Sequence, residues 1–188
     1  MMRRLSLATA ALEKGALVIC MALVLGLVLL NVVTRSLNYS LFWVDEAAVF
    51  AMVWGCFIGA SLLVHQRMDF AVTLLTDPLP DRLRHAARVL VDALVLGFGV
   101  LMVVLCWWWF DLPTLIAQDW NLQAFFEVNF NGIYMDRPTT VNLPKWPFFL
   151  VMPWFALTTT IHATANLLED LSAMRSGAAF AERQEAEV

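Results

Sequence analysis

Charged residues are scarce in this chain. Asp, Glu, Lys and Arg make up 15% of its 188 residues, whereas hydrophobic residues make up 61%. A soluble domain carries roughly 25% charged and 45–50% apolar residues. Because the shortage of charge falls in four long apolar blocks, the sequence predicts an integral membrane protein.

Cysteine is scarce as well. Cys20, Cys56 and Cys106 each lie inside an apolar block. An odd number of thiols in such blocks argues against a disulfide framework, and their scatter argues against a metal site. We expect them to be small apolar packing residues. No basic tract is present and the net charge is -4, so no nucleic acid partner is expected.

Catalytic motifs are missing. The sequence holds no nucleophile elbow, no phosphate-binding loop and no metal-binding cluster. Only one histidine, His162, falls in a predicted membrane helix, and a membrane cytochrome would need paired histidines facing one haem. We therefore expect a protein that is not an enzyme and holds no cofactor. His162 is expected to form a hydrogen bond within helix packing, with contact to a partner or a proton as the alternative.

The four apolar blocks predict an all-α membrane protein with four transmembrane helices in a single domain, 1–188. Crossing a bilayer core of about 30 Å takes about 20 helical residues. The first block is longer than the apolar core of a signal peptide, so we expect a retained helix. The segment Met1–Lys14 could lie on the membrane surface. The helices are expected at about 15–34, 45–64, 89–110 and 146–168, and Pro153 should kink the last one.

The distribution of lysine and arginine predicts that both termini are cytoplasmic. Nine of the 12 lie before the first helix, between the second and third helices, or in the tail 169–188, and cytoplasmic segments carry such an excess. The remaining loop, 111–145, is then periplasmic. It is long, acidic and aromatic, so a short helix near Leu115–Val128, lying on the membrane or on a partner, is expected.

Polar residues meet where the first helix ends and the second begins. Asn31 and Arg35 are four residues apart on one helix face, and Asp45 and Glu46 follow Trp43 at the start of the second helix. An ion near the membrane is costly unless paired, so Arg35 should pair with one of the two acids. Alternatively, the acids cap the helix and Arg35 reaches lipid headgroups. A contact of this group with another subunit is a third possibility.

The second helix also carries a small-residue face. Small residues let membrane helices approach closely. The packing face is predicted from Trp54, Gly55, Gly59 and Ser61. This pattern indicates helix packing without identifying the partner.

These motifs occur in an order that resembles a known family. They are Asn31-x-x-x-Arg35, Phe42-Trp43-x-Asp45-Glu46, Trp54, Gly59-Ala60, Arg67 with Leu74-Leu75, Leu79-Pro80 and Arg82-Leu83, and finally Leu143-Pro144-x-Trp146 with Pro153. The chain resembles the small, DctQ-like membrane subunit of tripartite ATP-independent periplasmic (TRAP) transporters. It departs from that family at Met68-Asp69, where a histidine is common, and in its longer 111–145 loop.

The resemblance implies a function in the bacterial inner membrane. Such a small subunit is a scaffold for a large multi-helix subunit that binds sodium and substrate, and a periplasmic solute-binding protein delivers an organic acid. Trp120, Phe125 and Glu127 are then candidates for contact with a periplasmic partner, and Arg67 and Asp69 mark the inner connection. The alternatives are a membrane-anchor subunit of a redox enzyme, using His162 and Asp92, and a self-associating four-helix membrane protein.

Overall fold

The computed structural model describes residues 1–67, 80–141 and 143–176. Within these ranges the chain is helical and contains no strand. Four helices are long and apolar enough to cross a membrane: Met2–Ser36, Phe42–Gln66, Ala86–Ala117 and Trp146–Ser172. The predicted all-α fold with four membrane-spanning helices is therefore confirmed.

The first helix, α1 (Met2–Ser36), is one continuous rod. The segment Met1–Lys14, which could lie on the membrane surface, forms the first turns of this helix from Met2 onward. No proline interrupts α1, and Ser6, Ala10 and Glu13 are buried. These three residues share one face because their spacing follows the helical period. That face packs in the bundle, so the helix is continuous across residue 15, where it was expected to begin.

The second helix, α2 (Phe42–Gln66), runs back alongside α1 and ends at Arg67, which takes the left-handed conformation with φ 52°. Helix α4 (Asp81–Phe110) follows, and it ends at Asp111 in the same conformation, with φ 35°. A left-handed residue is a common way to stop a helix, although glycine usually fills this position. Both helices thus end at a charged residue in the left-handed conformation.

The predicted fourth helix consists of two pieces, α7 (Trp146–Phe149) and α8 (Val151–Ser176). The break at Leu150 lies three residues before Pro153. Proline cannot donate a backbone hydrogen bond, and its ring clashes with the carbonyl four residues earlier. Pro153 was expected to kink the helix, and the structure instead shows a helix break on the N-terminal side of Pro153.

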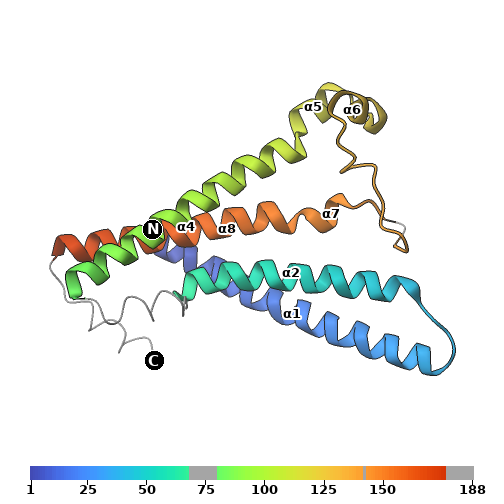
Figure 1. The fold of residues 1–188 in the computed structure, drawn as a ribbon, viewed down its shortest axis with the longest axis horizontal. Coiled ribbons are helices and arrows are strands. Elements are labelled where there is room, and N and C mark those ends of the chain that lie inside the picture. The colour runs from blue at the N-terminus through green and yellow to red at the C-terminus, as the bar shows by residue number, and fades with distance from the viewer. Residues whose placement is uncertain (68–79, 142, 177–188) are drawn as a thin grey trace.

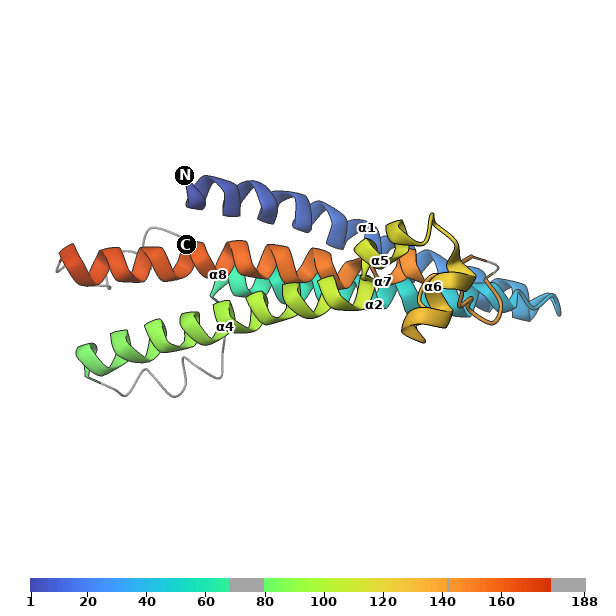
Figure 2. The ribbon, with the colours of Figure 1, turned by 90° about the horizontal axis from the view of Figure 1, so that it is seen from above.

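Helix α8 is the centre of the bundle and contacts α1, α2 and α4. Figure 2 shows it lying between α1 and α4. At Gly99 of α4 a Cβ atom would come within 2.7 Å of Thr160 Oγ1 and 3.3 Å of its backbone nitrogen, so the two backbones approach closely there. Figure 1 shows α4 diverging from α8 beyond this crossing, toward α5.

The two ends of the bundle differ. The turn between α1 and α2 lies at the same end as the 111–145 segment, and we call this the loop end (Figure 1). The start of α4 and the end of α8 lie at the opposite end, which we call the N-terminal end.

The 111–145 segment contains two short helices, α5 (Leu112–Ala117) and α6 (Leu122–Asn129). The expected single helix over Leu115–Val128 is wrong, because Asp119 and Trp120 adopt left-handed conformations with φ of 50° and 60°. The Asn121 side chain then caps α6 by accepting hydrogen bonds from the next turn. The segment has its own small core, made of Phe110, Leu115, Phe125, Ile133 and Tyr134.

Candidate functional site

At the loop end, an ion pair joins α1 to α2. Arg35 Nη2 lies 2.9 Å from Asp45 Oδ2. Arg35 also donates from Nε to Asn31 Oδ1 at 2.8 Å, and Asn31 donates to Asp45. The structure thus brings together three of the residues singled out in the sequence. Trp43 is two residues before Asp45 on α2, with 44% of its surface exposed.

The neighbouring acid, Glu46, takes a different partner. Its carboxylate accepts backbone hydrogen bonds from Thr139 at 2.9 Å, Thr140 at 2.8 Å and Val141 at 3.0 Å. The Thr140 hydroxyl also donates to it. Charge-assisted hydrogen bonds of this kind are stronger than neutral ones. Glu46 therefore fastens the last part of the 111–145 segment to α2, a contact that the sequence pattern did not reveal.

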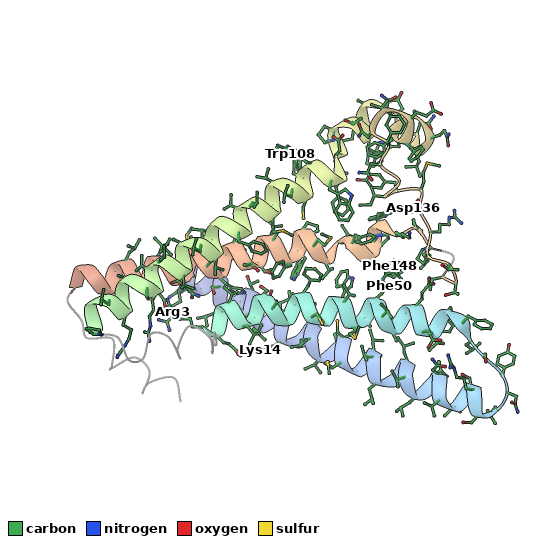
Figure 3. The ribbon with its side chains drawn as sticks, in the orientation of Figure 1. Arg3, Lys14, Phe50, Trp108, Asp136 and Phe148 are labelled. Atoms are coloured by element: carbon green, nitrogen blue, oxygen red, sulfur yellow. The ribbon has the colours of Figure 1, made fainter. Side chains whose placement is uncertain are left out.

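Further along α2, two aromatic contacts attach α7. Trp54 donates from Nε1 to the Phe148 carbonyl at 2.9 Å. The Phe50 and Phe148 rings stack with centroids 3.9 Å apart, and Figure 3 shows them facing each other between α2 and α7. This face of α2 is consequently occupied by the chain's own fourth helical segment.

The small-residue face of α2 also packs within the chain. A Cβ atom at Gly55 would lie 3.6 Å from Cys20 Cβ, and one at Gly59 would lie 3.9 Å from Leu17 Cδ1. Both glycines therefore face α1. Ser61 is hydrogen-bonded to Thr158 of α8 with 2.7 Å between their oxygens.

At the N-terminal end, Arg67 joins α2 to α8. It donates to Asp170 Oδ1 at 2.7 Å and to the Asn166 carbonyl at 2.8 Å. Its Nη2 also lies 3.9 Å from a carboxylate oxygen of Asp92 on α4 and of Glu169 on α8. Asp69, the second residue proposed for this connection, lies outside the described residues.

A buried polar cluster between α1, α2 and α8 was not foreseen as a group. His162 Nε2 lies 3.0 Å from Glu13 Oε2, and its Nδ1 lies 2.7 Å from Ser6 Oγ. Glu13 and His162 are fully buried and Ser6 is 2% exposed. The expected hydrogen bonding of His162 is present. Ser6 and Glu13 are seven residues apart, a spacing that places them on one face of a helix. This signal was missed because the first helix was expected to begin only at about residue 15.

The three candidate partner residues of the 111–145 segment differ in exposure. Trp120 is 64% exposed and Glu127 is also exposed, whereas Phe125 is 1% exposed and packs against Tyr134. The buried side chain of Phe125 cannot contact another protein. Trp120 and Glu127 stay predictions.

An apolar pocket of about 610 Å³ lies where this segment meets α4 and α8. Its lining includes Cys106, Trp107, Phe110, Trp120, Tyr134 and Trp146. Tyr134 donates from its hydroxyl to the Phe110 carbonyl at 2.6 Å. Burial, and to a lesser degree the charge of Asp111, raises the pKa of Tyr134. The pocket offers little to a polar substrate.

The polar contacts described above hold this chain's own helices and its loop together. Within the described residues, no group of three or more His, Cys, Asp or Glu side chains is placed to hold a metal ion. The arrangement is suited to joining helices at both ends of a bundle rather than to chemistry on a bound substrate.

Comparison with known proteins points to one family. Residues 24–173 match the model described as tripartite ATP-independent periplasmic transporters, DctQ component. The C4-dicarboxylate TRAP transporter small permease protein DctQ of Vibrio cholerae serotype O1 is 28% identical over 113 residues, which is 60% of this chain and 48% of that protein. The match thus spans about half the length of this relative. No solved structure matches.

Proposed function

The chain belongs to the DctQ family of TRAP transporters, and from this we propose that it is the scaffold subunit of a sodium-coupled uptake system. It is an inner membrane protein and not an enzyme. In the proposed complex a large multi-helix subunit binds sodium and an organic acid, which a periplasmic binding protein delivers.

The observation that carries the proposal is how the polar side chains of the spanning helices are used. Arg35 pairs with Asp45 at one end, Arg67 with Asp170 at the other, and His162 with Glu13 between them. Transporters instead keep polar groups and broken helices near the membrane centre for their substrate. Polar groups that bind one another across helices favour a static frame over a moving carrier.

We propose that the loop end is periplasmic and the N-terminal end cytoplasmic. The excess of lysine and arginine before α1, between α2 and α4, and after α8 supports this orientation. The tryptophans Trp43, Trp107 and Trp146 lie toward the loop end, as residues of an interfacial aromatic belt would.

The surface proposed for the large subunit is the exposed apolar side of α1 or α4. Since Gly55 and Gly59 already face α1, the small-residue face of α2 is occupied. Exposed apolar residues remain on α1, such as Leu25, and on α4, such as Leu101, with 62% and 53% of their surfaces accessible. In the membrane these side chains contact lipid or another helix.

Site-specific photocrosslinking tests this proposal. The chain is co-expressed with the large membrane subunit encoded beside it, with a photoreactive residue at position 25 or 101. We expect one of these positions to crosslink to the large subunit and position 156, where Ala156 is fully buried, to give none. Failure of the two proteins to co-purify, with uptake intact when this chain is deleted, would refute the scaffold role.

The proposed contact with the binding protein involves Trp120 and Glu127. Trp120→Ser and Glu127→Gln should slow binding-protein-dependent uptake without lowering the amount of assembled complex. Tyr39→Phe, at an exposed residue of the α1–α2 turn, serves as the control. Unchanged uptake in the double variant would exclude this contact.

One other function is disfavoured by a specific observation, and a second is distinguished by experiment. A redox anchor would need a histidine nitrogen directed at haem iron, but both nitrogens of His162 have partners in Ser6 and Glu13. A self-associating protein would form stable homo-oligomers without the large subunit. Light scattering of the purified chain distinguishes that case from the scaffold.

A further inference from the structure

In the buried cluster, the single hydroxyl of Ser6 lies between two imidazole nitrogens. Its Oγ lies 2.9 Å from His65 Nδ1 and 2.7 Å from His162 Nδ1. A serine hydroxyl has one proton to donate. At most one of the two Nδ1 atoms can receive it, so at least one of the two imidazoles must carry a proton on Nδ1 and donate to Ser6.

The position of that proton sets the charge of the cluster. If His65 donates to Ser6, then Ser6 donates to His162 Nδ1 and His162 donates from Nε2 to Glu13. The Glu13–His162 pair then carries one negative charge. If His162 donates to Ser6, one further proton lies between His162 Nε2 and Glu13 Oε2, and the pair is neutral.

Burial favours the neutral arrangement. Glu13 and His162 have no exposed surface, and an uncompensated charge in such surroundings is costly, whereas a hydrogen-bonded pair of opposite charges is tolerated. The surrounding helices carry other charges. Arg3 of α1 lies 3.5 Å from Glu169 of α8, and Arg67 next to α2 binds Asp170. His162 is the basic group that faces Glu13.

We propose that Glu13, His162 and Ser6 form a proton-binding site within the bundle, connected to the N-terminal end through His65. The bound proton is the one that makes the Glu13–His162 pair neutral, with His162 protonated on Nδ1. It fastens the first half of α1 to α8. The proposal rests on this cluster alone and not on the scaffold function.

The connection to His65 allows the site to fill and empty. A proton on His65 Nδ1 passes to Ser6 Oγ as the hydroxyl proton of Ser6 passes to His162 Nδ1. One N–H bond breaks and one forms, the hydroxyl is restored with the new proton, and one positive charge moves from His65 to His162. His65 is half-buried, unlike His162, so it is the member closer to solvent.

The order serine, histidine, glutamate also occurs in hydrolases, but the geometry excludes that activity here. A serine nucleophile needs a substrate carbonyl within reach and donors for the oxyanion. Ser6 is 2% exposed and is enclosed by α1, α2 and α8. The cluster is therefore suited to holding a proton rather than to acting on a substrate.

Nuclear magnetic resonance of the histidine nitrogens tests the proposal directly. The chain has 3 histidines, so isotope labelling of histidine in the full chain gives three sets of imidazole signals. His65→Gln, His85→Gln and His162→Gln assign them. We expect His162 Nδ1 to carry a proton and His65 Nδ1 to be an acceptor.

Two variants then separate a proton site from ordinary packing. Glu13→Gln should remove the charge that favours the proton and leave His162 with a single protonated nitrogen. Ser6→Ala should slow exchange of the His162 proton with water, and the exposed Glu127→Gln should change neither signal. An unprotonated His162 Nδ1 in the unmodified chain would overturn the proposal.

Discussion

Glu46 accepts a backbone hydrogen bond from Thr140, a residue 94 positions further along the chain, at 2.8 Å. The preceding acid, Asp45, binds Arg35 instead. Two adjacent carboxylates thus hold different parts of the loop end: one joins α1 to α2, and the other fixes the segment before α7.

Because the two carboxylates have different partners, Glu46→Gln and Asp45→Asn should have different effects. Glu46→Gln should loosen the segment around Thr140, because an amide is a weaker acceptor for several backbone donors than a carboxylate. Limited proteolysis should then cut between residues 131 and 145 at a higher rate. Asp45→Asn, the matched control, should leave this rate unchanged, and equal sensitivity in both variants would contradict the assignment.

Gly99 and Gly97 offer a second matched pair on α4. Gly99→Ala places a Cβ atom against the backbone of Thr160, so the two helices must move apart, and overpacking of this kind costs about 1–3 kcal/mol. Gly97 has no atom within 4 Å of an added Cβ, so Gly97→Ala should be neutral or slightly stabilising. Thermal unfolding of the purified chain measures both, and equal midpoints would contradict the close approach.

Arg67 should be costly to remove because Asp170 is nearly buried. The side chain of Asp170 is 3% exposed, and Arg67→Met leaves its charge without the cation that binds it. Breaking a buried ion pair costs about 3–5 kcal/mol, and the partial exposure of Arg67 places the expected loss near the lower end. Adding Asp170→Asn should restore part of the stability, as a double-mutant comparison of unfolding midpoints can show.

The exposed pair Lys145–Asp136 is the control for this prediction. Lys145 Nζ lies 3.6 Å from Asp136 Oδ2, and the side chains of Lys145 and Asp136 are 38% and 60% exposed. Such surface ion pairs contribute roughly 0–1 kcal/mol to stability. Lys145→Gln should therefore change stability little. A loss as large as that of Arg67→Met would mean that burial is not what distinguishes the two pairs.

The sequence predicted the four helices, and it offered the pairing of Arg35 with an acid of α2 as one of three possibilities, because these depend on local patterns. Apolar length determines a membrane span, and four-residue spacing determines a shared helix face. Phe125 shows the limit of such patterns, because an aromatic residue in a polar loop can face a partner or the loop's own core. Only the packing around Tyr134 distinguishes the two.

Contacts between distant segments were beyond sequence reasoning for a related reason. Glu13 lies in a short basic stretch that reads as interfacial, and its burial depends on where α8 places His162. Thr140 binds Glu46 only because the stretch that follows α6 returns the chain to α2 (Figure 1). Neither partner carries a spacing signal, since the intervening segments set the geometry.

The final prediction concerns Tyr134, whose pKa is raised by burial. A tyrosine with a folded pKa above its unfolded value of about 10 contributes stability that is fully present below that value. This stability is lost as the pH rises through the folded pKa, because the unfolded chain ionises more readily. The core of the 111–145 segment should therefore loosen in alkali, and tryptophan fluorescence from the adjacent Trp120 should report it.

Tyr134→Phe should remove that alkaline step while costing about 0.5–1.5 kcal/mol at neutral pH through the lost hydrogen bond to Phe110. The chain has 2 tyrosines, and Tyr39 is 68% exposed, so Tyr39→Phe is a natural control that should preserve the step. If the step survives in Tyr134→Phe and disappears in Tyr39→Phe, the buried hydroxyl is not its origin.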